Sequence, residues 1–321
     1  MPFPPTTPRP AASATAHRAV PPRAMPAVLG DARDRRLWLC IATSTLLTLC
    51  LVRGAGLSIT GATPFLLCGL AAVALRLAGP LLVPTRAAAL PEAAGHYAAF
   101  MLIALTGATA SYPISALTIG FHDAGLQRID TLLGFDWLRW YRVVASHPAL
   151  QWLGLAAYRS IYITPALLLG YHAATGRRDA ARRFLATFWL AAVLTLALFA
   201  FLPAVGPFSY LWRGPIPYWP DSQQWQIGMI PLLRSGAERT IDLAHLHGLV
   251  SAPSFHTAAA VLYIHAAWPI RRLRWPLLTL NAAMLLSTPV EGTHYLSDML
   301  IGAVVAVAAV VIVRRALPDA A

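Results

Sequence analysis

Residues 292–313 read GTHYLSDMLIGAVVAVAAVVIV, a short polar opening followed by an unbroken apolar run. A run of this length predicts a membrane-spanning helix. His294 and Asp298 lie four residues apart at its start, on one face of the helix, where the carboxylate can hydrogen-bond the imidazole. Ionisable groups are costly in a bilayer and are kept there mainly for function. The stretch therefore predicts a transmembrane helix that begins at a functional site.

A second stretch has the same design. Residues 252–257, APSFHT, open another apolar run and place His256 at the start of a second predicted helix. Two histidines and an aspartate at matching depths indicate one shared site. Ser254, Thr257 and the N–H groups of the first turn form a helix N-terminus, which attracts anions and phosphate above all.

The composition is that of an integral membrane protein. Of 321 residues, 57% are hydrophobic and 12% are charged, and the charged fraction is about half that of a soluble globular domain. The apolar runs are long and do not alternate, which predicts helices rather than a barrel. Every basic residue is arginine, in short clusters between the apolar runs. We therefore interpret the net charge of +12 as a topology signal and not as a nucleic-acid footprint.

An all-α polytopic fold with eight spans is expected. Residues 1–30, rich in Pro and Ala, are interpreted as a disordered cytoplasmic tail. Residues 31–94 are expected to hold two transmembrane helices, residues 95–315 a six-helix catalytic bundle, and residues 316–321 a short cytoplasmic tail. The predicted spans are 37–53, 62–83, 96–118, 151–174, 184–204, 254–270, 275–291 and 294–313.

The arginine clusters set the expected orientation. With eight spans, all of them fall on one side of the membrane, which the positive-inside bias makes cytoplasmic. Both termini are then cytoplasmic, and both histidine-bearing helix starts face the exoplasmic side. Arginine without lysine, with abundant Ala and Pro, is typical of a GC-rich bacterial genome, so we expect an inner membrane with a periplasmic site. The clusters lie at 33–36, 86, 177–183, 271–274 and 314–315.

Two long polar segments share the exoplasmic side in this topology. Residues 119–150, with Asp130 and Trp137, are interpreted as a surface helix anchored by aromatic side chains. Residues 205–253, rich in Pro and Trp, are expected to fold over the helix ends as a lid. Glu291, near the same face, is either a substrate contact or a solvated helix end, and we favour the second.

The pair of His294 and Asp298 can support several reactions. A carboxylate bonded to one ring nitrogen fixes the tautomer and leaves the other nitrogen with a basic lone pair. That nitrogen can act as a nucleophile, a general base or a metal ligand. With His256 as a second proton donor or acceptor and cationic donors for the oxygens, the set suits phosphoryl transfer through a phosphohistidine.

At these residues the chain resembles the type 2 phosphatidic acid phosphatase superfamily, and most closely its inositol phosphorylceramide synthase-like branch. That branch has the forms Pro-Ser-x-His-Thr and Gly-x-His-Tyr-x-x-Asp, which match residues 253–257 and 292–298. Asn281 in the intervening helix fits as well, and the resemblance covers roughly residues 95–315.

The resemblance implies a role for each motif residue. His294 is the nucleophile, Asp298 orients it, and His256 protonates the leaving oxygen. Ser254 binds phosphate, with Thr257 beside it as a further candidate ligand. No metal or other cofactor is implied.

The family's phosphate-binding basic residues are not found at their usual positions. Residues 202–207, LPAVGP, stand in place of a first motif that has a lysine followed by Arg-Pro, and Thr288 stands where the larger branch has an arginine. Arg159, within the fourth span, either has an anionic partner or extends to the interface. The candidate phosphate-binding cations are Arg159, Arg234 and Arg239, with Arg213 as a further possibility.

We therefore expect a metal-independent membrane enzyme that hydrolyses a lipid phosphomonoester or diphosphate on the exoplasmic face through a phosphohistidine. The alternative is a lipid phosphotransferase in which the same residues pass a headgroup phosphate to another alcohol. A transporter or scaffold is more remote, because its polar groups would lie near the bilayer midplane. A zinc hydrolase built on the two histidines and the aspartate is a minor alternative. The expected partner is the lipid phosphate; the headgroup, the acceptor and the oligomeric state are left open.

Overall fold

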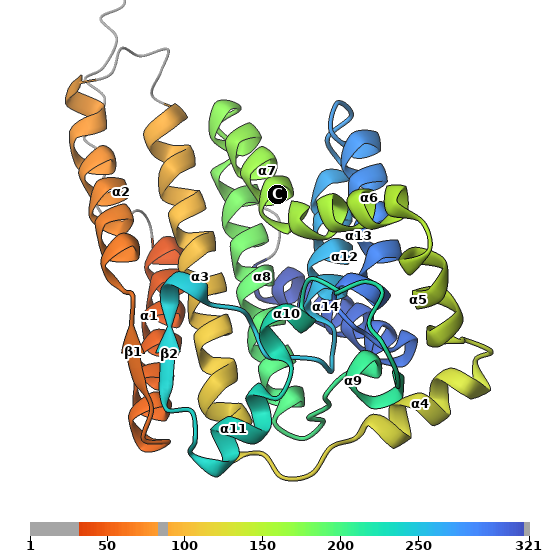
Figure 1. Cartoon of the computed structure of the whole chain (residues 1–321). Helices are drawn as coiled ribbons and strands as arrows, with labels where there is room; N and C mark the ends of the chain where they lie inside the picture. Colours follow the sequence, from red (N-terminus) through yellow and green to blue (C-terminus); the bar gives the residue numbers. More distant parts are fainter. Residues whose placement is uncertain (1–31, 83–88, 318–321) are drawn as a thin grey trace, which may run out of the picture.

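The structure is a computed structural model that describes residues 32–82 and 89–317 (Figure 1). Most of the described chain is helical, and the sheet it contains has two strands of three residues each. The predicted all-α fold is therefore confirmed. The tail expected for residues 1–30, the arginine at 86 and residues 318–321 of the second tail lie outside the described residues.

Five helical segments of the described chain are long and apolar enough to cross a membrane, which confirms a polytopic membrane protein. They are Asp34–Gly54 of α1 (Ala32–Gly54), α3 (Ala89–Leu117), Pro148–Ala174 from α6 to α7, α8 (Arg178–Phe199) and α14 (Leu296–Ala316).

Three further helices occupy the remaining predicted spans: α2 (Thr63–Leu82), α12 (Phe255–Ala267) and α13 (Arg274–Glu291). The short apolar helix α12 packs against α8, α13 and α14. Its alanines at 258–260 and the ring of Tyr263 are fully buried. Small residues let neighbouring helices approach closely, so α12 forms the centre of the bundle.

The fourth predicted span is interrupted rather than continuous. It consists of α6 (Pro148–Arg159), a 3₁₀ turn at Ser160–Tyr162 and α7 (Ile163–Ala174). Figure 1 shows α6 lying across the direction followed by α3 and α8. Pro165 stands in the first turn of α7, where it cannot donate a backbone hydrogen bond to the preceding turn, so the helix restarts there. The break brings the end of α6 to the side of α12 and α13.

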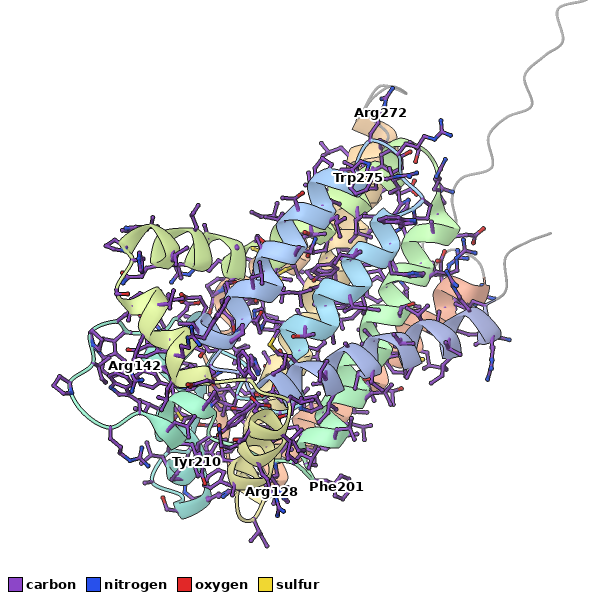
Figure 2. All side chains as sticks on the ribbon, turned by 90° about the vertical axis from the view of Figure 1, so that its right-hand side faces the viewer. Arg128, Arg142, Phe201, Tyr210, Arg272 and Trp275 are labelled. Atoms are coloured by element: carbon purple, nitrogen blue, oxygen red, sulfur yellow. The ribbon has the colours of Figure 1, made fainter. Side chains whose placement is uncertain are left out.

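The arginines that begin α8 and those that precede α13 lie at one end of the molecule. Arg182 at the start of α8 pairs with Asp34 at the start of α1 at 2.7 Å, and Arg178 pairs with Glu92 at the start of α3 at 2.9 Å. Figure 2 places Arg272 and Trp275 at one extremity and Arg128, Phe201 and Tyr210 at the other. The side of the membrane to which each end belongs stays a prediction.

The opposite end carries the two long polar segments. Residues 119–150 contain α4 (Asp123–Leu132), α5 (Trp137–Ala145) and the start of α6. Residues 205–253 contain α9 (Pro207–Leu211), α10 (Gln223–Gln226), α11 (Met229–Ser235) and β2 (Thr240–Asp242). β2 pairs in parallel with β1 (Ser58–Thr60), with Ser58 opposite Thr240, and so connects this segment to the chain between α1 and α2. Of these elements, α4, α9 and α10 lie near the end of α14 that holds the candidate site, whereas α11 packs against α3 (Figure 1).

Candidate functional site

The site is centred on the start of α14, where His294 and Asp298 are brought together. Nδ1 of His294 lies 3.0 Å from Oδ1 of Asp298, and both side chains are buried. The other carboxylate oxygen, Oδ2, accepts a hydrogen bond from the backbone N–H of Tyr295 at 2.8 Å. Asp298 therefore serves two purposes, since it caps the helix and faces one ring nitrogen of His294. Nε2 is left as the reactive nitrogen.

The backbone before His294 is held in an unusual conformation. Thr293 has φ of 50°, a left-handed value that is rare for a β-branched residue and indicates strain at a functional site. Its hydroxyl accepts a hydrogen bond from Nε2 of Gln223 at 2.9 Å, and both residues are buried. A side chain on Gly292 would begin 2.5 Å from Cδ2 of His294, so only glycine leaves room for the ring in this position.

Two buried aspartates of α4 fix the start of α14 from outside. Asp130 accepts hydrogen bonds from the N–H groups of Leu296 at 2.8 Å and Ser297 at 2.7 Å, which the helix itself leaves unpaired. Asp123 accepts from the Tyr295 hydroxyl at 3.0 Å and from the N–H groups of residues 205 and 206 at 3.0 Å. Burial raises the pKa of Asp123, against the opposing effect of these hydrogen bonds.

The interpretation of residues 119–150 as a surface helix anchored by aromatics is therefore wrong for its central residues. Asp130 and Trp137 are both buried. The Trp137 indole donates to the carbonyl of Pro289 at 2.6 Å, near the end of α13. The segment is a support for the site, and sequence periodicity could not show this because the partners lie more than 150 residues away.

The two motifs touch through the start of α12. Ser254 is its N-cap: its hydroxyl oxygen accepts from the Thr257 N–H at 3.3 Å and from the Thr257 hydroxyl at 3.1 Å. The N–H of Ser254 donates to the carbonyl of Asp298 at 3.2 Å. A side chain on Gly302 would collide with the carbonyl of Ser254, so the glycine permits this close approach of α14 to α12.

His256 is the second residue of α12, whose N-cap Ser254 contacts α14, and this brings His256 within electrostatic range of His294. Its imidazole stacks on the ring of Tyr158, with centroids 4.0 Å apart and planes 15° from parallel. Tyr158 is the second-last residue of α6, so the break after α6 determines where this ring stands. Tyr158 had no signal in the sequence, because its partner lies about a hundred residues further along the chain.

Glu291 is buried, and its interpretation as a solvated helix end is wrong. Its carboxylate accepts hydrogen bonds from the Tyr218 hydroxyl at 2.7 Å and the Asp221 N–H at 3.2 Å, and its carbonyl accepts from the Ser222 N–H at 2.9 Å. Burial and the neighbouring carboxylate raise the pKa of Tyr218. Glu291 thus attaches the segment of residues 218–222 to the end of α13.

Of the candidate arginines, Arg159 is adjacent to the site. It follows Tyr158, and its Nη2 lies 2.6 Å from Oδ1 of Asp221, while its side chain is 60% exposed. Both sequence-based alternatives are therefore partly correct: the guanidinium has an anionic partner and also reaches the surface.

Arg234 and Arg239 are engaged elsewhere, which argues against the phosphate-binding role expected for them. Arg234 donates to the Thr118 hydroxyl at 2.8 Å and the Gly120 carbonyl at 2.9 Å, at the end of α3, and its guanidinium lies over the ring of Phe121. Arg239 adjoins the small sheet, where its carbonyl accepts from the Ser58 N–H at 2.8 Å. Figure 1 shows this sheet beside α1 and α3, away from α12 and α14. Arg213 donates to backbone carbonyls within its own loop.

The described residues contain no group of three or more His, Cys, Asp or Glu side chains arranged to hold a metal ion. Asn281, which also matched the family pattern, donates to the Thr164 hydroxyl at 3.2 Å and is fully buried between α13 and α7.

The comparison with protein families agrees with the geometry. The model of the PAP2 superfamily matches residues 124–312, which is more than half of the chain and includes both histidine motifs and α4. No match was found among curated proteins or among solved structures. The narrower branch indicated by the motifs stays a prediction.

Proposed function

Because the chain belongs to the PAP2 superfamily, we propose that it hydrolyses a lipid phosphomonoester or diphosphate through a phosphohistidine formed on His294. Membership indicates a phosphatase-type enzyme acting on lipid phosphates in a membrane. The observation that carries the finer proposal is the buried pair of His294 and Asp298, 3.0 Å apart, with the imidazole of His256 beside it.

In the first step Nε2 of His294 attacks phosphorus. The P–N bond forms as the bond to the leaving oxygen breaks, and His256 transfers a proton to that oxygen. The leaving group is an alcohol for a phosphomonoester and a lipid monophosphate for a diphosphate. Asp298 faces Nδ1 and stabilises the positive charge that develops on the ring. The stack on Tyr158 holds His256 in one orientation, so the proton is delivered from a fixed direction.

In the second step water replaces the leaving group. His256, now neutral, accepts a proton from the attacking water, the new P–O bond forms, and the P–N bond breaks to release phosphate and neutral His294. Each bond formed is matched by one broken, and both histidines return to their starting states.

The phosphate oxygens need donors in both steps. Ser254 accepts two hydrogen bonds from Thr257, which leaves its own hydroxyl hydrogen available. The first N–H groups of α12 have no partner within the helix and favour an anion. In this proposal Arg159 supplies the cation: its guanidinium leaves the carboxylate of Asp221 and binds the phosphate instead.

The lipid reaches this site from the membrane. We place the site on the exoplasmic face of an inner membrane, with both termini cytoplasmic, because the arginine cluster that begins α8 lies at the other end of the bundle. A phosphate at the interface then meets the histidines without crossing the apolar core.

A lipid phosphotransferase is the second candidate. It uses the same first step and differs in that an alcohol, not water, resolves the phosphohistidine. The form Pro-Ser-x-His-Thr at residues 253–257, which resembles the inositol phosphorylceramide synthase-like branch, favours it.

The test is phosphate release by the purified full-length protein in detergent, with chelator present, across a panel of lipid phosphates and diphosphates. We expect release that His294→Ala abolishes and that His147→Ala, an exposed histidine between α5 and α6, leaves unchanged. An acid-labile, alkali-stable phosphate label on the wild-type protein that is absent from His294→Ala would identify the intermediate. Release by His294→Ala equal to that of the wild type would contradict the proposal. So would wild-type release that occurs without chelator and is lost when chelator is added.

A further inference from the structure

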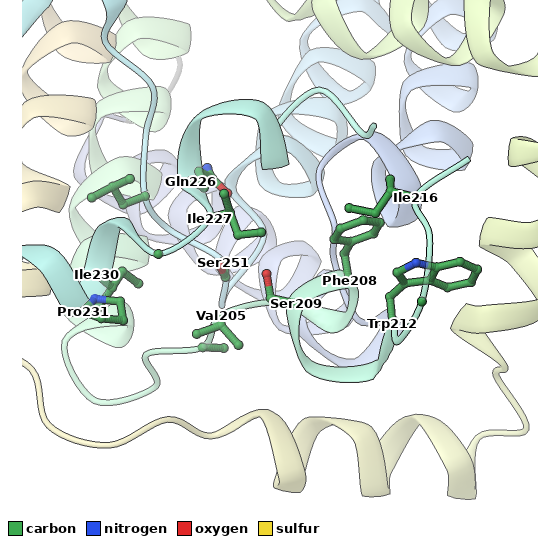
Figure 3. Close-up of a pocket in the computed structure, with 14 residues that line it drawn as sticks. Val205, Phe208, Ser209, Trp212, Ile216, Gln226, Ile227, Ile230, Pro231 and Ser251 are labelled. Carbon is green, nitrogen blue, oxygen red and sulfur yellow. The ribbon is translucent and has the colours of Figure 1, made fainter. Parts of the chain in front are cut away.

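A cavity of about 380 Å³ lies in the segment between α8 and α12, at the same end of the bundle as the histidines. This is within the size range of small-molecule sites. Its walls come from α9 and the residues on either side of it, from the junction of α10 with α11, and from the loop that leads into α12 (Figure 3).

The chemistry of the walls restricts what the cavity accepts. Phe208, Trp212 and Ile230 are among its apolar residues, and none of the fourteen residues that line it in the described chain is charged. Phosphate, carboxylate and ammonium groups would be buried here without a counter-charge, which is unfavourable. The cavity therefore suits the uncharged, hydrocarbon part of a ligand.

Three polar side chains also line it: Ser209, Gln226 and Ser251. The hydroxyl of Ser209 donates to Gln223 at 2.8 Å and keeps its acceptor capacity, and Gln226 donates its amide to the carbonyl of Gly248 and keeps its own oxygen. Ser251 is 6% exposed, and its hydroxyl has no hydrogen-bond partner among the described residues. Figure 3 shows Ser209 and Ser251 between the apolar walls.

This polar set matches a hydroxyl group. An alcohol donates one hydrogen bond and accepts others, so it can donate to the oxygen of Gln226 or Ser209 and accept from the Ser251 hydroxyl. Since Ser251 lines the cavity and no hydrogen bond of its hydroxyl is described, this hydroxyl is available to a ligand.

The cavity is close to the reactive histidine. Gly206, between cavity residues Val205 and Phe208, abuts Thr293: a side chain on it would begin 2.7 Å from the Thr293 carbonyl. The hydrogen bonds from Ser209 to Gln223 and from Gln223 to Thr293, at 2.8 and 2.9 Å, form a second connection to the residue before His294. Ser251 precedes the N-cap of α12 by three residues.

We propose that this cavity binds an uncharged lipid alcohol beside the phosphohistidine, with Ser251 as the residue that recognises its hydroxyl. The inference rests on the proposed function, because it supplies the alcohol of that reaction. The alcohol is either the leaving group held after the first step or an acceptor that resolves the intermediate. In the second case the alcohol oxygen bonds to phosphorus, the P–N bond to His294 breaks, and His256 takes the alcohol proton.

Binding is tested separately from catalysis, with a photoreactive dodecanol as the probe. We expect crosslinks to peptides of residues 204–231, and labelling about three- to tenfold weaker in Ser251→Ala, as the loss of one hydrogen bond predicts. Ile216→Trp, which fills the cavity, should weaken labelling similarly. Ser235→Ala is the matched control, because this exposed serine at the end of α11 bonds only to Leu232 and Ala237 and lies outside the cavity. His294→Ala should label like the wild type.

The source of the alcohol is then read from the products. With a lipid phosphate donor and dodecanol present, formation of dodecyl phosphate identifies an acceptor site, whereas inhibition of phosphate release without that product identifies a leaving-group site. Equal labelling of Ser251→Ala and Ser235→Ala, or crosslinks outside residues 204–251, would overturn the inference. An absence of phosphate release from every donor, with labelling intact, would count against the proposed function and not against the cavity.

Discussion

Arg159 and Asp221 form an ion pair next to the histidine site: Nη2 of Arg159 lies 2.6 Å from Oδ1 of Asp221, and Nε donates to the same oxygen at 3.2 Å. Arg159 follows Tyr158, which stacks on His256. The only charged partner of this guanidinium among the described contacts is thus a carboxylate on the segment that Glu291 holds in place. A carboxylate and a phosphate make the same kind of bond to arginine, so Asp221 would compete with a phosphate that Arg159 binds in the proposed function.

Removing that competitor should tighten phosphate binding. Asp221→Asn is expected to lower the inhibition constant of orthophosphate about two- to fivefold, the range for a partly exposed ion pair, while Arg159→Ala raises it about tenfold or more. Inhibition of phosphate release measures both values. Arg128→Ala, an exposed arginine on α4, is the control. An unchanged constant in Asp221→Asn would show that Arg159 does not bind phosphate.

The aspartate that faces His294 should control the rate rather than the fold. In Asp298→Asn the amide oxygen can still accept the hydrogen bond from the Tyr295 N–H. The amide then has no second oxygen to face Nδ1 of His294, and it carries no negative charge to stabilise a charged imidazole ring. We expect kcat to fall about 10³- to 10⁴-fold with little change in KM.

Steady-state phosphate release measures this effect, and near-wild-type thermal unfolding in detergent would show that the fold is retained. Asp136→Asn is the matched variant, because Asp136 caps α5 at the surface and accepts from the Arg139 N–H at 3.0 Å. A kcat within threefold of the wild type in Asp298→Asn would contradict the assigned role.

The close approach of α14 to α12 depends on a glycine. In Gly302→Ala the new methyl group meets the backbone carbonyl of Ser254, which cannot rotate away. We expect destabilisation of about 1–3 kcal/mol from overpacking and a large loss of activity, since both motifs shift.

Gly170→Ala provides the matched comparison, because no atom lies within 4 Å of the added group in α7. Alanine favours a helix over glycine by about 1 kcal/mol, so this variant should be as stable as the wild type or more so. Thermal unfolding of the two variants tests the difference. Equal midpoints would show that the helices tolerate a wider separation.

The strained Thr293 should depend on Gln223. In Gln223→Ala the hydroxyls of Thr293 and Ser209 lose a buried partner, at a cost of about 1–3 kcal/mol. We expect a lower kcat, because the backbone conformation of Thr293 determines the orientation of the His294 side chain. The neighbouring Gln224 is exposed, so Gln224→Ala should behave as the wild type in unfolding and in turnover. Indistinguishable kinetics in the two variants would remove Gln223 from the support of the site.

His247 should make the protein less stable in mild acid. Burial holds its pKa below the usual 6.5 in the folded protein. The folded state therefore binds fewer protons than the unfolded chain in the window below pH 6.5, and stability falls as pH decreases through that window. In His247→Gln the fall in unfolding midpoint between pH 7.5 and pH 5 should be smaller.

The exposed neighbour offers the comparison for this prediction. His245 pairs with Asp242 at 2.7 Å at the surface, so His245→Gln controls for the loss of a histidine from the same segment. Thermal unfolding of the three proteins at both pH values suffices. An equal dependence in wild type and His247→Gln would assign the acid sensitivity to other groups.

Much of the architecture followed from local sequence. Long apolar runs predicted the helices. The reason is that a segment crossing a bilayer must satisfy its backbone hydrogen bonds internally, which a helix does. The four-residue spacing of His294 and Asp298 predicted their proximity, because helical geometry alone brings such residues together. The family resemblance rested on the same short motifs and is confirmed at the level of the superfamily.

The tertiary structure alone decided which distant groups support those motifs. Asp130 reaches the start of α14, Tyr158 stacks on His256, and Glu291 is buried under the segment that holds Asp221. Arg159 follows the residue that stacks on His256, whereas Arg234 bonds to the end of α3, for the same reason. Local periodicity records which face of a helix is apolar, whereas these contacts join residues 60 to 170 positions apart. Their positions depend on how the helices pack, and that is set by the whole chain.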